Sequence, residues 1–246
     1  MKQHTPEWDQ ARLGRATASQ AEHWMSELRG GGVPAGRRAY LATLVLQRIG
    51  GVLVPGYQTE AMRYGIETEA EARHAYAFEK NVDVVEVGFI PHPRIELAGA
   101  SPDGYIGDDG LVEFKCPQPW NHMETLLRGT IALRYRYQMG FQMACTGRAW
   151  CDYVSYCNQF PEPMQLSITR VKRDEEVITP LEKECVRFLS EVDDTVQALC
   201  RRYPMELPDA PKGIPVPPLS RQTPTGLTEC NSPRNDAGAM LLLEAR

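Results

Sequence analysis

The strongest constraint on the fold is residues 101–117, SPDGYIGDDGLVEFKCP, where charged residues interrupt a β-rich stretch. The GDDG sequence in its middle is typical of a hairpin turn. Alternate residues of a strand point to the same face, so Glu113 and Lys115 share one face and Phe114 turns into the core. If the turn pairs its flanking strands, Asp103 lies near Glu113. The stretch therefore predicts a hairpin that gathers two carboxylates and one ammonium group.

Two carboxylates that lie this close repel each other unless a positive charge lies between them. Mg²⁺ prefers oxygen ligands and often completes its shell with phosphate oxygens. In such a site Lys115 would orient the attacking water and favour its deprotonation. The alternative is a surface hairpin with a Glu113–Lys115 ion pair. A Ser-Pro-Asp turn is followed ten residues later by Glu-x-Lys. On this pattern alone, the metal site and the surface ion pair are about equally well supported.

The rest of the chain alternates between helix-like and strand-like segments. Apolar spacing and Ala/Glu content predict helices, with Thr17 or Ser19 as the first N-cap, over residues 17–25, 37–50, 59–80, 133–145 and 174–202. Runs rich in β-formers predict strands over residues 82–90, 95–101, 110–116, 149–157 and 164–171. This order predicts an α/β (α+β) fold with a mixed central β-sheet flanked by helices.

The domain organisation follows from composition. Residues 1–207 are expected to form a single domain, since 42% of the chain is apolar and no internal repeat interrupts it. Residues 208–246 form a tail rich in Pro and Gly. Its terminal segment, AGAMLLLEAR, is equally compatible with a short helix and with a frayed end.

Charge and cysteine content narrow the class of protein. The net charge of -5 argues against coating nucleic acid by bulk charge but leaves room for a local basic groove. The seven cysteines include no CxxC pair, which is typical of a reduced cytoplasmic protein. The sequence has no leader-like N-terminus and no apolar run of about 18 residues, so we expect no membrane span.

The motifs together resemble a known nuclease family. Asp103 followed by Glu113-x-Lys115 resembles the signature of the PD-(D/E)xK nuclease superfamily. The fuller string SPDG…VEFKCP resembles the phage recombination exonucleases of the lambda exonuclease type, the YqaJ-type viral recombinases. Three more motifs resemble that family in the same order: EWDQARLGRATAS, RYGIETEAEAR and YQMGFQM, at residues 7–19, 63–73 and 137–143. Their joint occurrence is more specific than any single motif.

The resemblance implies a restriction-endonuclease-like core with two Mg²⁺ ions, for which Mn²⁺ can substitute. It implies that Asp103, Glu113 and the main-chain carbonyl of Phe114 bind the metals, while Lys115 positions the attacking water.

Two further catalytic residues come from the resemblance alone. Glu69 matches a helical glutamate that reaches the active site, although the residues by themselves do not separate it from Glu67 and Glu71. Gln138 matches a glutamine that holds water or a phosphate oxygen.

The resemblance also implies a pocket for the 5′-terminal phosphate, formed by Arg12, Ser19 and Ser101. Arginine can grip a phosphate with a bidentate fork, and N–H groups near a helix start add donors. Met62 matches a side chain that inserts between bases, although a core methionine is the commoner role. The chain departs from the family after Lys-Cys-Pro, where Asn121 replaces a basic residue. His122 is the candidate substitute for it.

The expected function is a Mg²⁺-dependent 5′-to-3′ exonuclease that degrades one strand of duplex DNA to mononucleotides and leaves 3′ overhangs. The resemblance implies a homotrimeric ring, a 5′-phosphorylated duplex end as substrate, a single-strand-annealing recombinase as partner, and a phage or prophage origin in a bacterial host. Two alternatives remain open at this point. One is a structure-specific endonuclease of the same fold, and the other is a non-catalytic DNA-binding assembly module.

Overall fold

The computed structural model describes residues 1–246 except 28–30, 54–59, 206–207 and 209–246. The described residues fall within one compact unit, Met1–Val216. The Pro- and Gly-rich tail and its terminal segment therefore lie outside the described residues, apart from Pro208. The domain boundary near residue 207 stays a prediction.

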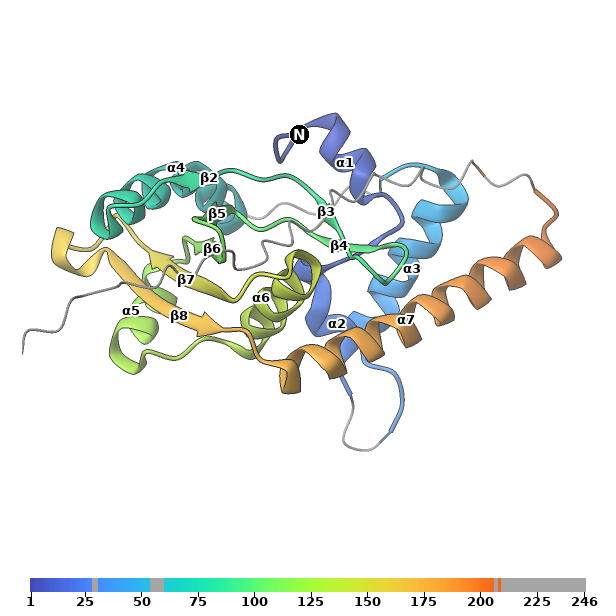
Figure 1. Ribbon diagram of the computed structural model, residues 1–246. Helices are drawn as coiled ribbons and strands as arrows, with labels where there is room; N and C mark the ends of the chain where they lie inside the picture. The colour runs from blue at the N-terminus through green and yellow to red at the C-terminus, as the bar shows by residue number, and fades with distance from the viewer. Residues whose placement is uncertain (28–30, 54–59, 206–207, 209–246) are drawn as a thin grey trace, which may run out of the picture. The chain divides into compact units, whose positions relative to one another are not determined.

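The strands form two sheets rather than one (Figure 1). The larger sheet has the order β2 (Val84–Val85), β5 (Gly104–Ile106), β6 (Gly110–Lys115), β7 (Trp150–Tyr156) and β8 (Leu166–Lys172). The smaller sheet has the order β1 (Ala16–Thr17), β4 (Ala98–Ala100) and β3 (Ile90–Pro91). β6 pairs with β7 and β1 with β4 in parallel, while the other pairs are antiparallel. The predicted mixed fold flanked by helices is confirmed, with the sheet divided in two.

Seven α-helices are described: α1 (Pro6–Arg12), α2 (Ala21–Met25), α3 (Ala35–Gly50), α4 (Glu60–Lys80), α5 (Pro119–Arg128), α6 (Leu133–Thr146) and α7 (Glu175–Arg202). The five predicted helices correspond to α2, α3, α4, α6 and α7. Sequence periodicity missed α1 and α5, which are short and begin with a proline at their first turn. Thr17 occupies the N-cap position of the 3₁₀ turn Ala18–Gln20 but makes no capping hydrogen bond, and α2 itself has Gln20 as its N-cap, so Ser19 is wrong as a cap.

The hairpin forms, but with a different first strand from the one expected. β5 pairs with β6 in antiparallel register, with Ile106 opposite Gly110 and Gly104 opposite Val112. The expected partner, residues 95–101, instead supplies β4 of the smaller sheet. Pro102 cannot donate a ladder hydrogen bond, so the chain leaves one sheet here and enters the other. Asp103 still reaches β6, because it directly precedes β5.

Helices α4 and α6 cover opposite faces of the larger sheet. On one face Tyr76 of α4 packs edge-on against Phe114 of β6, with the ring centroids 5.8 Å apart. On the other face Met139 of α6 packs with Leu111 of β6. Strand alternation places Glu113 on the same face as Leu111. The glutamate therefore points toward α6.

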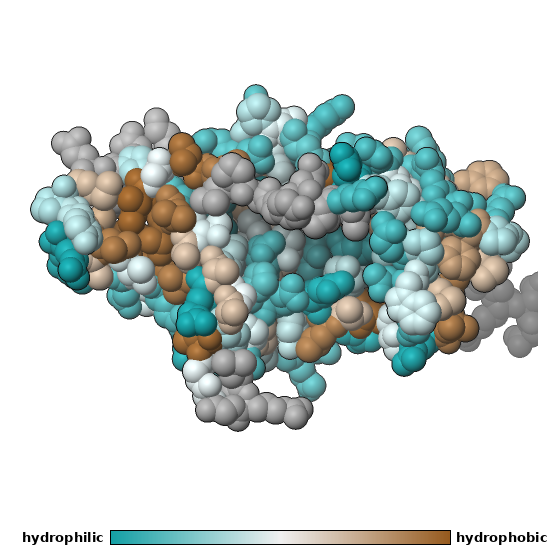
Figure 2. Space-filling view, turned by 180° about the vertical axis from the view of Figure 1, so that it is seen from behind, coloured by the Kyte–Doolittle hydropathy of each residue, from teal (hydrophilic) through white to brown (hydrophobic). Residues whose placement is uncertain are grey.

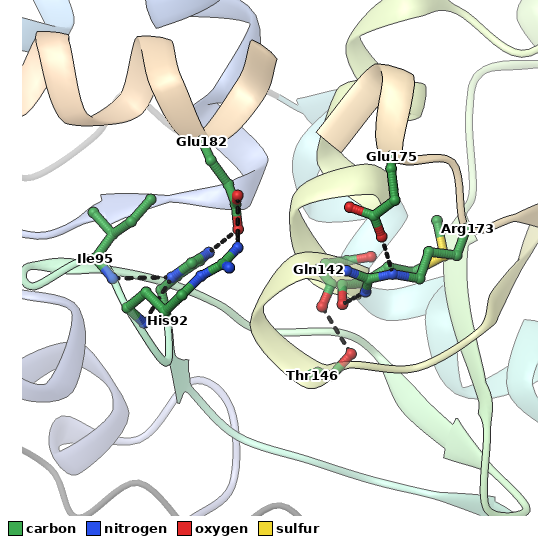
Figure 3. Close-up of polar contacts among 9 residues, drawn as sticks. His92, Ile95, Gln142, Thr146, Arg173, Glu175 and Glu182 are labelled. Carbon is green, nitrogen blue, oxygen red and sulfur yellow. Dashed lines mark hydrogen bonds and ion pairs between the residues drawn. The ribbon is translucent and has the colours of Figure 1, made fainter. Parts of the chain in front are cut away.

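Helix α7 and the smaller sheet close the other side of this unit. Trp24, Tyr40, Phe141 and Phe188 form the centre of a core that joins α2, α3, α6 and α7. Helix α7 is also fixed by polar contacts at Glu182, which pairs with His92 at 3.0 Å and with Arg94 at 2.7 Å (Figure 3). These contacts connect α7 to the loop between β3 and β4.

The structure can be compared with the expectations about cysteines and membrane spans only over the described residues. The six cysteines described, which exclude Cys230, are all free thiols. In the same residues no helix has the length and apolar content that crossing a bilayer requires.

Candidate active site

A cavity of ≈190 Å³ lies where α1, α4, α6 and the β5–β6 hairpin meet. On the face seen from behind, hydrophilic side chains surround a hollow in its middle (Figure 2). The cavity is lined by eight residues that the sequence singled out: Arg12, Ser19, Glu69, Ser101, Asp103, Glu113, Lys115 and Gln138. These residues come from separate parts of the chain, so tertiary folding brings them together.

The two carboxylates on the hairpin lie as the strand pattern required. Asp103 Oδ2 accepts a hydrogen bond from the backbone N–H of Phe114 at 2.6 Å, one residue beyond Glu113. Burial raises the pKa of Asp103 well above its ordinary value, and the negative charge of Glu113 raises it further. The pair therefore carries an electrostatic strain that a bound cation would relieve.

Glu113 is only 1% exposed and is held from α6 by two glutamines. Gln138 Nε2 donates to Glu113 Oε1, and Gln142 Nε2 donates to Glu113 Oε2 at 2.6 Å. The two glutamines are four residues apart, so they share one face of the helix. Sequence reasoning chose Gln138 and missed Gln142, although the i, i+4 spacing within YQMGFQM was the available signal. Both oxygens of Glu113 thus have fixed orientations.

Lys115 supplies the positive charge beside the carboxylates. Its Nζ forms an ion pair with Glu113 Oε1 and lies 5.2 Å from the centre of the Tyr135 ring. Burial lowers the pKa of Lys115, but the nearby charges of Glu113 and Asp103 outweigh burial and raise it overall. The lysine therefore stays protonated at neutral pH and acts as a cation and hydrogen-bond donor.

The donor set fits a hard divalent cation. Carboxylate oxygens of Asp103 and Glu113 are the ligand type that Mg²⁺ and Mn²⁺ prefer. Gln142 Oε1 is buried and has no hydrogen-bond partner among the described residues, which leaves one more oxygen unsatisfied near the pair. Within those residues no three His, Cys, Asp or Glu side chains are grouped closely enough to hold a metal by themselves. Water and substrate oxygens would have to complete the shell.

Glu69 stands at the wall of the cavity rather than in the carboxylate pair. It lies on α4 and forms an ion pair with Arg73 at 2.8 Å. Its charge still raises the pKa of Asp103, though less than Glu113 does. The structure thus singles out Glu69 from Glu67 and Glu71, because neither of these lines the cavity.

The opposite end of the cavity offers hydrogen-bond donors. The Arg12 guanidinium stacks over the Trp8 ring at 3.8 Å, and Trp8 Nε1 donates to Ser101 Oγ at 2.9 Å. Among the described residues Arg12 Nε is buried without a hydrogen-bond partner. Ser19 Oγ lies 3.4 Å from Thr17 Oγ1. A half-buried cation that lines the same cavity as two hydroxyl groups is a suitable surrounding for an anion such as phosphate.

Three residues from the sequence argument are not part of this lining. His122 is wrong as a substitute phosphate ligand, because its ring is buried and contacts Ser155 Oγ and the Met164 carbonyl, both at 2.8 Å. The Phe114 side chain lies in the core on the other face, as predicted, and the role of its carbonyl stays a prediction. Met62 belongs to α4, and its side chain lies outside the described part of the structure.

The fold places this chain in a class of mixed α/β proteins that includes solved exonuclease structures. The alkaline exonuclease LHK-Exo from Laribacter hongkongensis shares 43% identity, with 80% of this chain and 97% of that chain covered and a TM-score of 0.76. LHK-Exo has also been solved in complex with dAMP. A phage-related exonuclease from Haemophilus somnus 129PT shares the fold at 13% identity and a TM-score of 0.59, covering 75% of this chain and 96% of that one.

The sequence of the chain also identifies its family. Residues 7–149 match the YqaJ-like viral recombinase domain. This chain belongs to the YqaJ-like viral recombinase family and is a homologue of an alkaline exonuclease. No curated protein matches it.

Proposed function

We propose that this protein is a Mg²⁺-dependent 5′-to-3′ exonuclease of duplex DNA that releases mononucleotides and leaves 3′ single-strand overhangs. The observation that carries the proposal is the shared cavity of the Asp103–Glu113–Lys115 cluster and the Arg12 donors. A metal-dependent phosphodiesterase needs the first group, and recognition of a strand end needs the second. The similarity to an alkaline exonuclease supports the same reaction.

Asp103 and Glu113 would hold the metal, with the Phe114 carbonyl as the further ligand that the family resemblance implies. When bound, Mg²⁺ supplies Lewis-acid stabilisation of phosphoryl oxygens and lowers the pKa of bound water. Gln138 and Gln142 fix both oxygens of Glu113, so the carboxylate keeps its orientation when substrate arrives.

Lys115 would orient the attacking water and offset negative charge as the phosphorus–oxygen bond breaks. Burial lowers its pKa, but the charges of Glu113 and Asp103 raise it overall, which favours the cationic form. Glu69 would influence the electrostatic field from the cavity wall, with Arg73 limiting its charge.

Arg12, Ser19 and Ser101 would bind the 5′-terminal phosphate. Trp8 orients this group by stacking on Arg12 and by donating to Ser101. A phosphate held here would fix the distance from the strand end to the carboxylates, so that cleavage removes one nucleotide at a time. Met62 is the proposed wedge at the duplex end.

The proposal includes a homotrimeric ring around the duplex and a single-strand-annealing recombinase that takes over the 3′ overhang. Both rest on the family resemblance, as does a phage or prophage origin in a bacterial host. A closed ring would also explain how an acidic protein keeps hold of DNA, since its inner surface can be basic while the exterior is not.

The decisive experiment digests a linear duplex labelled at either the 5′ or the 3′ end, with Mg²⁺ or with EDTA. We expect early release of labelled mononucleotide from the 5′ end with Mg²⁺, and no release with EDTA. Covalently closed circular DNA serves as the control. Cleavage of the circle would favour a structure-specific endonuclease, and the absence of metal-dependent release would favour a non-catalytic module.

A further inference from the structure

A second cavity adjoins the candidate active site on the other side of Arg12. It measures ≈620 Å³, and Arg12 and Thr17 line both cavities. Its walls come from the segment between α1 and α2 and from one side of α3, and they include Arg15, Gln20 and His23. Cavities of roughly 300–1,000 Å³ are typical of sites for small ligands. This one has room for a nucleotide.

Arg15 brings a buried positive charge to this cavity. The residue is 5% exposed, and its Nε is buried without a hydrogen-bond partner among the described residues. Arg37, which is equally buried, donates to the Trp24 carbonyl at 2.6 Å and to Glu191 at 2.8 Å. A buried charge without a partner is costly. Arg15 therefore has the donors that an incoming anion would use.

The backbone around Arg15 is held in place by hydrogen bonds, although Nε of its side chain has no hydrogen-bond acceptor among the described residues. Gly14 N donates to Gln47 Oε1 at 2.9 Å, and Arg48 Nε donates to the Gly14 carbonyl at 2.9 Å. Gly14 adopts a φ of +66° and lies so close to Arg48 that a Cβ would come within 2.9 Å of it. Helix α3 thus holds the Gly14–Arg15 segment in place. The guanidinium is presented by a rigid support.

The charges around the cavity favour an anion. Arg12 and Arg15 both line it, and Asp9 is the single carboxylate on its described walls. Burial lowers the pKa of Arg15 most. The negative charge of Glu96 raises this pKa, and the positive charge of Arg48 lowers it. Arg48 is already paired with Asp193, so it is less available to a ligand.

We propose that this cavity is a second phosphate subsite, in which Arg15 binds the phosphate of an unpaired nucleotide at the 5′ end of the DNA strand. The inference rests on the proposed function, in which Arg12 holds the phosphate next to the scissile one. A strand that continues past Arg12, away from the carboxylates, places its next phosphate in this cavity. The enzyme would then accept duplex ends with one unpaired 5′ nucleotide, would release a dinucleotide in the first cleavage, and would release mononucleotides once the new 5′-terminal phosphate reaches Arg12.

The test measures binding to the full-length protein in EDTA, so that no hydrolysis occurs. Calorimetry compares thymidine 5′-monophosphate with the 5′-phosphorylated thymidine dinucleotide. We expect the dinucleotide to bind about tenfold more tightly, because one more charge-assisted phosphate contact forms. Arg15→Gln should reduce this preference to less than twofold, and Arg15→Lys should keep part of it.

Arg37→Gln is the matched control, since it removes an equally buried arginine outside the cavity. It should keep the tenfold preference at temperatures where the variant is folded. Equal loss of preference in Arg37→Gln and Arg15→Gln would overturn the proposal. So would an unchanged preference in a folded Arg15→Gln variant.

Two measurements on the wild-type protein do not depend on a variant that folds. The affinity for the dinucleotide should fall more steeply with salt than that for the mononucleotide, by about 0.7 in the log–log slope. A 5′-phosphorylated duplex with one unpaired 5′ nucleotide should also bind more tightly than a flush duplex. Equal slopes, or equal affinities for the two duplexes, would contradict the subsite. Because neither measurement involves cleavage, it can succeed or fail independently of the exonuclease assay.

Discussion

Two buried carboxylates on neighbouring parallel strands have opposite surroundings. Glu113 on β6 and Asp152 on β7 are each 1% exposed. Asp152 accepts from Arg170 through both oxygens, at 2.8 and 2.9 Å, and from the Tyr76 hydroxyl at 2.8 Å. Glu113 shares one lysine with a second carboxylate, the partly buried Asp103.

We interpret the difference as that between a structural ion pair and a candidate ligand site. The charge of Asp152 is balanced by the guanidinium of Arg170, and both of its oxygens accept hydrogen bonds, so no bound cation is required to stabilise it. When both carboxyl groups are ionised, the Asp103–Glu113 pair carries one more negative charge than Lys115 neutralises. Burial alone therefore does not mark a functional acid, whereas burial with unmatched charge does. Four predictions test this comparison, from the largest expected effect to the smallest.

Glu113→Gln should abolish nuclease activity, with a loss of roughly 10⁴-fold or more, as for other residues that act as part of a catalytic unit. Stability should change less than in Asp152→Asn, because relief of repulsion with Asp103 offsets the loss of the ion pair with Lys115. Turnover on a linear duplex and urea unfolding measure the two effects. If Glu113→Gln retained most of its activity, the carboxylate would not be a metal ligand.

Asp152→Asn should show the reverse pattern. Breaking a buried ion pair costs about 3–5 kcal/mol, and here we expect about 2–3 kcal/mol because Arg170 is about half exposed. Urea unfolding gives the loss of stability, and turnover at a temperature where the variant is folded should stay near that of the wild type. A large loss of activity in the folded variant would remove the distinction between the two acids.

Metal binding should strengthen as pH rises. Asp103 has a raised pKa and must lose its proton to bind a cation, so affinity should increase by up to tenfold per pH unit below that pKa. In the metal-free protein, folding stability should instead decrease as pH rises. A carboxyl group with a raised pKa contributes stability below its ordinary value of 3.8, and this contribution is lost as pH rises through the raised pKa.

The measurement is calorimetric titration with Mg²⁺ over a pH series, together with thermal unfolding in EDTA. Asp103→Asn should remove both pH dependences. A metal affinity that is flat above pH 4 in the wild-type protein would show that Asp103 is already ionised, against the electrostatic argument.

Arg12→Ala should have the smallest effect. It removes the guanidinium that stacks on Trp8, so the preference for 5′-phosphorylated over 5′-hydroxyl ends should fall by about tenfold, the value of one charge-assisted contact. Rates on two duplexes that differ only in the 5′ group give this ratio. An unchanged ratio would mean that the terminal phosphate binds elsewhere.

Part of this site was predictable because it depends on local spacing. Strand alternation required Glu113 and Lys115 to share a face and Phe114 to turn inward, and the hairpin turn brought Asp103 to Glu113. The choice of strand partner was not predictable in the same way. Residues 95–101 have the composition of a hairpin strand, yet the Ser-Pro step transfers the chain to a second sheet before β5 begins.

The sequence by itself determined the acids, the lysine and the family motifs, because their relations are set by the two-residue period of a strand and by short-range turn chemistry. Only the tertiary structure decided that Gln142 joins Gln138 on Glu113, that Glu69 rather than Glu67 or Glu71 lines the cavity, and that His122 is buried away from the site. Those contacts join segments far apart in the chain. Their formation depends on how α4, α5 and α6 pack against the sheet, and no local pattern records that packing.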